Sequence, residues 1–175
     1  MKRLVFLLLI LTFVWAVSAV ADPIAPLAPL NALGKQALAA EGKTEADMLN
    51  DVPPKEIVGI PAYPGSYFGG SMGTGDVLYT VSLMSKDSPE KVVEWYRKKL
   101  GTAWQSAPDQ ATAALKEVGV FLETDKKNVN AMDAMKLKQV RISKVENQQD
   151  TGFAGMMFDV TGIKTMINIT VKPMM

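Results

Sequence analysis

The chain has 175 residues, 48% of them hydrophobic, with 19 basic and 18 acidic side chains and a formal net charge of +1. This balance gives no electrostatic case for binding nucleic acid or an anionic membrane surface. Cysteine and histidine are both absent, which excludes disulfides, thiolate nucleophiles, Ser-His-Asp triads and nearly all zinc and iron sites. We therefore expect no cofactor, and any catalysis would have to use Asp, Glu, Lys, Tyr or Ser.

Residues 1–21 have the layout of a secretory signal peptide. Lys2 and Arg3 precede an apolar run from Leu4 to Val17, and the small residues of Ala19-Val20-Ala21 follow it. This order predicts an exported protein, periplasmic or secreted, that is cleaved after Ala21. An uncleaved anchor is the alternative, because an apolar stretch of this length reaches the lower edge of what spans a bilayer. With cleavage, the chain would contact the membrane only through this segment, before it is removed.

Cleavage would leave 175 minus 21, or 154, residues, with 17 basic and 18 acidic side chains, enough for one domain with its own core. Residues 22–56 are predicted to be a Pro/Ala-rich tether with short helices over 32–40 and 44–50. Three prolines in the first part of this segment disfavour a regular helix. Its leucines could dock on a surface, or the segment could be mobile; they are Leu27, Leu30 and Leu33.

Residues 57–175 are predicted to form a single α+β domain. Residues 60–68 contain two prolines, which is typical of an edge strand. The glycine cluster that follows lacks the lysine of a phosphate-binding loop and leads into a strand, so a hairpin loop is predicted. Residues 76–84 alternate apolar and polar side chains, which predicts a half-buried strand.

The clearest local signal predicts a helix over about 88–100. Ser88 is a good N-cap, Pro89 suits the first helical position, and Gly101 suits the position after the last turn. Its apolar stripe consists of Val92, Val93, Tyr96 and Leu100.

In the C-terminal half, helices and strands are predicted from changes in the spacing of apolar residues. A helix is expected over 109–118 and a helical turn over 130–135, while 120–123 could extend the first helix or form a short strand. Period-two patterns predict a strand over 138–145 and, after a polar loop, a hairpin of 153–161 and 163–172 around Gly162. The fold class is therefore α+β: an antiparallel sheet of four or five strands with the 88–100 helix packed on one face.

Two segments carry a resemblance. Ile60-Pro61-Ala62-Tyr63-Pro64-Gly65 is followed by a stretch from Ser85 to Leu100 that contains Asp87-Ser88-Pro89-Glu90, with Trp104 after it. Together they resemble exported bacterial proteins of uncharacterised function that carry a P-x-YPG strand and then a DSPEEVVxFYxxxL…GW strand-helix unit. The resemblance implies a helix covering an antiparallel sheet. It implies no catalytic residues, because the shared positions are caps, turns and core.

Two features match a known kind of catalytic or metal site, but their sequence context favours a structural role for both. Asp150-Thr151-Gly152 matches the D-T-G of aspartic proteases, but it follows a polar stretch instead of a hydrophobic strand, so a solvated turn is predicted. The abundant methionines could hold Cu(I), which would need three converging sulfurs; adaptable core packing is the favoured interpretation. No catalytic, cofactor-binding or metal-binding residue is predicted.

A possible binding surface has two parts. Aromatic side chains at a helix edge could line a ligand groove, although such residues more often close a core; they are Trp95, Tyr96 and Trp104. On the last strand, Asn168 and Thr170 lie opposite the apolar Ile167 and Ile169, and an open face there would be a place for a partner. The leading hypothesis is a non-catalytic exported module that binds an envelope protein or a small ligand. The alternative is a carboxylate-based hydrolase acting on cell-envelope or sugar substrates.

Overall fold

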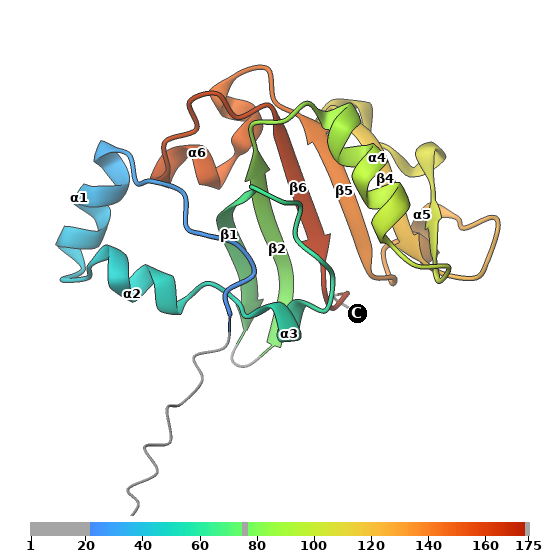
Figure 1. Ribbon diagram of the computed structural model, residues 1–175, viewed down its shortest axis with the longest axis horizontal. Coiled ribbons are helices and arrows are strands. Elements are labelled where there is room, and N and C mark those ends of the chain that lie inside the picture. The colour runs from blue at the N-terminus through green and yellow to red at the C-terminus, as the bar shows by residue number, and fades with distance from the viewer. Residues whose placement is uncertain (1–21, 75–76, 174–175) are drawn as a thin grey trace, which may run out of the picture.

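The structure, a computed structural model, describes residues 22–74 and 77–173 (Figure 1), so the predicted signal segment lies outside the described residues. The helices are α1 (Ala32–Ala40), α2 (Glu45–Asn50), α3 (Lys55–Val58), α4 (Pro89–Lys99), α5 (Ala131–Ala134) and α6 (Phe153–Met157), and the 3₁₀ turns are η1 (Pro108–Gln110), η2 (Ala113–Leu115) and η3 (Gln148–Thr151). The strands are β1 (Tyr67–Thr74), β2 (Val77–Ser85), β3 (Trp104–Ser106), β4 (Glu117–Glu123), β5 (Gln139–Lys144) and β6 (Thr165–Thr170). In this part of the chain, none of the helices combines the length and apolar character needed to cross a bilayer.

The strands form one antiparallel sheet in the order β1-β2-β6-β5-β4-β3. Helix α4 carries the chain across one face of the sheet, from β2 to β3 at the far edge, and β6 then returns between β5 and β2 (Figure 1). The predicted α+β class, with its antiparallel sheet and its helix on one face, is confirmed. The sheet has six strands where four or five were expected.

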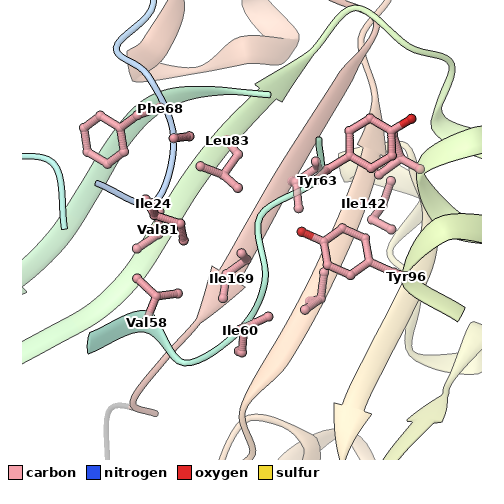
Figure 2. Packing of buried hydrophobic residues seen from close by; sticks show 14 of the residues in the cluster. Ile24, Val58, Ile60, Tyr63, Phe68, Val81, Leu83, Tyr96, Ile142 and Ile169 are labelled. Atoms are coloured by element: carbon pink, nitrogen blue, oxygen red, sulfur yellow. The ribbon is translucent and has the colours of Figure 1, made fainter. Parts of the chain in front are cut away.

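The main core lies between α4 and the sheet. A row of side chains crosses four strands because Val81 pairs with Ile169, Ile169 with Val140, and Val140 with Phe121. All four are buried. Figure 2 shows this cluster, with Tyr96 of α4 lying over the sheet near Ile142. The burial of Ile167 and Ile169 confirms the inward face predicted for the last strand.

Helix α4 has the predicted start. The Ser88 side chain accepts from the backbone N–H of Lys91 at 3.5 Å, and Pro89 occupies the first turn. Gly119 lets the helix approach β4, since a Cβ at this position would lie 2.5 Å from Cγ2 of Val93. The predicted helices over 32–40 and 44–50 are also confirmed, the second with Thr44 as its N-cap.

Two tyrosine hydroxyls join α4 and its N-terminal loop to the segment before β1. Tyr63 donates to Oδ2 of Asp87 at 2.7 Å, and Tyr96 donates to the carbonyl oxygen of Pro61 at 3.1 Å. The Y-P-G and D-S-P-E segments are therefore in direct contact. Burial, followed by the Asp87 contact, raises the pKa of Tyr63 to about 12.

The edge strand predicted over 60–68 is placed too early, since only residues 67–68 of this range belong to the edge strand β1, and most of the glycines predicted to form a hairpin loop lie within this strand. Residues 59–66 have no strand pairing, and Gly69, Gly70 and Gly73 lie inside β1. Two register shifts interrupt the pairing of β1 with β2. Gly69 sits against α6, where an added Cβ would lie 3.3 Å from Cβ of Ala154. Gly69 therefore allows β1 to pack closely against α6, and Gly70 and Gly73 lie at the two register shifts.

The prediction of a helix over 109–118 is also wrong. The segment forms the two short 3₁₀ turns η1 and η2, and Lys116 then adopts a left-handed conformation with φ of 51° before β4 begins. Leu115 and Val118 are exposed. For residues 120–123 the strand alternative is correct, and a helical turn is confirmed at α5.

The C-terminal hairpin prediction is half wrong. Residues 163–172 contain β6, and the strand predicted over 138–145 is confirmed as β5, but residues 153–157 form helix α6 instead of a partner strand. Ala154 and Phe158 are buried at a spacing of four, which is a helical period. β6 instead pairs with β2 and β5.

Residues 22–31 lie against the folded body. Ile24 belongs to the core under α4, while Ala28 and Leu30 join a second cluster with Met84 and Phe158. Leu27 is half-buried and Leu33 is exposed.

Candidate functional site

The sheet face opposite α4 is only partly covered. At one side, Ala134 of α5 packs on Val120 and Leu122 of β4. At the other side, Ala154 of α6 packs with Met84 of β2 and Met166 of β6. Between these two apolar contacts the sheet presents polar side chains, and a groove of about 440 Å³ lies over them. We call it the open-face groove; it is lined by Gly69, Gly70, Ser71, Met72, Thr80, Ser82, Leu115, Glu117, Ser143, Asp150, Thr151, Gly152, Phe153, Ala154, Met166 and Asn168.

The floor of the open-face groove is built from neighbouring strands. Ser82 of β2 pairs with Asn168 of β6, which pairs with Arg141 of β5. Because side chains alternate along a strand, these residues point away from the α4 core that holds Val81 and Ile169. The Ser82 hydroxyl donates to Oδ1 of Asn168 at 2.7 Å. The floor therefore presents a carboxamide and several hydroxyl groups on a rigid sheet.

One ion pair closes the β4 side of the floor. Arg141 donates from one guanidinium nitrogen to both carboxylate oxygens of Glu117, at 3.0 and 2.8 Å. The Glu117 side chain is only 2% exposed and also accepts from the backbone N–H of Thr112 at 2.7 Å. Arg141 is further fixed by Oε1 of Gln139 at 2.6 Å. The Glu117 carboxylate is thus nearly buried and neutralised.

A second ion pair joins two walls of the open-face groove. Lys116, just before β4, lies 2.8 Å from Asp150 in η3 and 2.8 Å from Glu146. Asp150 also accepts from the backbone N–H groups of Glu146 and Asn147. The Lys116 contact and these N–H bonds hold the pKa of Asp150 below its ordinary value, and the same ion pairs raise the pKa of Lys116. The D-T-G segment is thus a capped 3₁₀ turn whose carboxylate is already bound.

The rim of the open-face groove is apolar and exposed. Met72 of β1 is 50% exposed, Leu115 at the end of η2 is 61% exposed, and Phe153 at the start of α6 is 68% exposed. Each of them also lines the groove. Exposed apolar side chains gathered around a concave polar surface are typical of ligand-binding grooves.

The structure separates the predicted binding residues into two sets. Asn168 lines the open-face groove, and Thr170 lies on the same face opposite Thr80, half-buried. Trp95 and Tyr96 lie on the other face within α4; their rings meet edge-on at 4.8 Å, and Tyr96 has no exposed surface.

Trp104 lies in β3 at the sheet edge, half-buried against the core under α4. No described contact brings these aromatic rings to the open-face groove.

Sequence reasoning missed the walls and the rim of the open-face groove. Phe153 and Leu115 lie in segments whose secondary structure was predicted wrongly. The spacing of Ala154 and Phe158 was a helical signal for α6. The Arg141–Glu117 contact follows from the pairing of β4 with β5, which no local pattern reveals.

Among residues 22–74 and 77–173, no group of three acidic side chains is close enough together to hold a metal ion. A larger and more open hollow of about 860 Å³ between α1 and η3–α6 is lined by Leu33 and Met156 together with polar residues of 147–149. Comparisons with protein-family models, with curated proteins and with solved structures found no match to this chain.

Proposed function

We propose that this chain is a non-catalytic binding module whose ligand occupies the open-face groove. The observation that carries the proposal is a polar floor on a rigid sheet, enclosed by an exposed apolar rim, in a groove of about 440 Å³. Ligand sites of small molecules have volumes of about 300–1,000 Å³ and combine apolar walls with a few oriented polar groups.

The state of the groove carboxylates favours binding over hydrolysis. A carboxylate hydrolase needs one carboxyl group that can give up a proton near neutral pH and a second that can attack or activate water. Asp150 has a lowered pKa and accepts from Lys116 and from two backbone N–H groups. Glu117 is nearly buried and accepts two hydrogen bonds from Arg141. Both carboxylates are therefore engaged in hydrogen bonds and ion pairs that fix the groove walls.

Export is part of this proposal and rests on the order of residues in the segment 1–21. We expect the protein to be recovered outside the cytoplasm, beginning at Asp22. The intact mass of the protein from the periplasm or medium measures this directly. Recovery of the full-length chain from the membrane fraction would instead mean that the segment is an anchor.

Chemical-shift mapping of the ¹⁵N-labelled protein tests the binding function. The probes are neutral sugars, short peptides, organic acids and amines, each titrated alone. We expect at least one class to shift the amides of Ser82, Asn168 and Phe153 in a saturable way. Thr80→Trp, which fills the open-face groove, should abolish the shifts, while Ser106→Trp, at an exposed position on β3, should keep them.

Melting temperatures would show that both variants fold, and Met72→Trp on the rim provides a second blocking variant. Shifts confined to other surfaces, or shifts that persist in both blocking variants, would contradict the proposal.

A further inference from the structure

We propose that the ligand of the open-face groove is a neutral, hydroxyl-rich ring, namely a sugar unit of a glycan, with one ring face against Phe153. This inference rests on the proposed binding function and specifies its ligand class. Three features of the groove carry it: the neutralised charges, the chemistry of the floor and the position of the exposed aromatic ring.

The first feature is charge. The acidic side chains that line the open-face groove are Glu117 and Asp150, and each lies 2.8 Å from a basic side chain, Arg141 and Lys116 respectively. An anionic ligand would find these cations already paired, and a cationic ligand would have to compete with them. Neither would recover the free energy lost when its own charge leaves water. A neutral ligand avoids this cost.

The second feature is the floor. Thr80 and Ser82 of β2, Ser143 of β5 and Asn168 of β6 all line the open-face groove. Hydroxyl groups both donate and accept hydrogen bonds, and a carboxamide offers a donor and an acceptor side by side. Oδ1 of Asn168 accepts from Ser82, and among the described residues its Nδ2 has no hydrogen-bond partner within the chain. Such a floor matches a ligand that carries several hydroxyl groups on a fixed frame.

The third feature is the rim. Phe153 is 68% exposed at the first position of α6, and the groove begins beside it. A sugar ring has C–H groups on its faces and hydroxyl groups around its edge. It can therefore cover an aromatic ring with one face while its edge reaches hydrogen-bonding groups. A small polyol without a ring would leave Phe153 uncovered, and a purely apolar ligand would leave the floor unpaired.

An extended peptide fits less well. Peptides that add to a sheet bind along an edge strand through backbone hydrogen bonds. The start of the β1 edge is already occupied, because the N–H of Phe68 donates to the carbonyl of Pro26 at 2.7 Å and its carbonyl accepts from Ala28 at 3.4 Å. The open-face groove lies over the sheet face, where side chains and not backbone groups make the contacts.

Titration of the ¹⁵N-labelled protein with defined probes tests the ligand class. The probes are maltotriose, cellotriose and tri-N-acetylchitotriose as neutral sugars, trigalacturonate as a charged sugar, and trialanine as a peptide. We expect at least one neutral trisaccharide to shift the amides of Ser82, Asn168 and Phe153. Phe153→Ala should weaken its binding about tenfold, as loss of an aromatic anchor does, and Phe153→Tyr should retain it.

Met132→Ala provides the matched control, because Met132 is 69% exposed on α5, outside the open-face groove. Asn168→Leu should weaken binding independently of Phe153. If trialanine or trigalacturonate shifts the groove amides and no neutral trisaccharide does, the inference of a neutral sugar is overturned while the binding function stands. If none of these probes shifts the amides, the sugar inference is overturned, and the binding function is overturned as well if the organic acids and amines also fail to shift them.

Discussion

Glu117 and Arg141 form the contact on which the β4 side of the open-face groove depends. Removing a carboxylate from water costs several kcal/mol, and only a close cation and further hydrogen bonds offset this cost. Arg141 provides two of these bonds and the N–H of Thr112 a third. The pair therefore holds this groove wall in a fixed position but adds little net free energy to the stability of the fold.

Arg141→Met should lower the free energy of unfolding by about 3–5 kcal/mol, because it leaves Glu117 nearly buried without its cation. Urea denaturation measures the change. Lys43→Met is the matched control, because Lys43 pairs with Glu41 on the surface with both side chains more than half exposed, and its midpoint should not move. Adding Glu117→Leu to Arg141→Met should restore most of the loss; a double variant as unstable as the single one would contradict this account.

Tyr63 makes the stability depend on pH in the alkaline range. Its pKa is raised to about 12 by burial and by the Asp87 contact, whereas a tyrosine in the unfolded chain ionises near pH 10. The neutral phenol is therefore favoured in the folded state. Its stabilisation is fully present below pH 10 and is lost as the pH rises from 10 towards 12.

We expect the urea midpoint of the protein to fall between pH 9 and pH 11, and to fall less in Tyr63→Phe. Burial also raises the pKa of Tyr96, so the fall should be reduced but not abolished. Comparing the variant with the unchanged chain at both pH values separates the contribution of Tyr63 from that of all other groups. An equal fall in both proteins would mean that Tyr63 ionises freely in the folded state.

At the scale of elements, the sequence correctly predicts the helices and strands that are specified by a local pattern of residues. Helix α4 has a cap, a first-turn proline, an apolar stripe and a glycine after its last turn, and both β2 and β6 alternate cleanly. β1 is not among them, because Gly69 closely approaches Met84 and Ala154 and Gly70 has a positive φ, whereas clustered glycines in a sequence indicate a loop. Its identity as a strand comes from pairing with β2.

The same limit applies to the candidate site. The alternation of apolar and polar residues along the last strand is enough to predict that Asn168 and Thr170 lie on the face opposite Ile167 and Ile169, and the structure agrees. The walls could not be predicted, because they depend on contacts between distant residues. Lys116 lies 34 positions before Asp150, and α6 is held by Asn31, whose amide donates to the carbonyl of Met156.

Gly119 sets the distance between α4 and β4, and its substitution tests that packing. A Cβ there would lie 2.5 Å from Cγ2 of Val93, so Gly119→Ala should force the helix or the strand to shift, at a cost of about 1–3 kcal/mol. Gly101→Ala is the control, because an added Cβ there meets nothing within 4 Å. Thermal or urea denaturation measures both. Val93→Ala added to Gly119→Ala should recover part of the loss, and an unchanged midpoint in Gly119→Ala would refute the close contact.

At the scale of the whole molecule, residues 22–31 connect two hydrophobic clusters. Ile24 packs with Val58 and Ile60 in the cluster under α4, and Leu30 packs with Phe158 in the cluster under α6. Backbone hydrogen bonds anchor both ends, from Ile24 to the carbonyl of Pro53 and from Asn31 to the carbonyl of Met157. Because α6 also forms one wall of the open-face groove, this segment holds that wall in place.

Ile24→Ala and Leu30→Ala should each cost about 2–5 kcal/mol, because each side chain is at most 6% exposed and its removal leaves a cavity. Leu33→Ala, at a side chain that is 58% exposed in the neighbouring α1, should change little. Urea denaturation followed by circular dichroism measures the three. The two core variants should also differ at the groove: the amide of Phe153 should shift more in Leu30→Ala than in Ile24→Ala, because Leu30 contacts the α6 cluster directly. If all three variants denature at the same urea concentration, residues 22–31 act as a tether and contribute nothing to the folded body or to the groove.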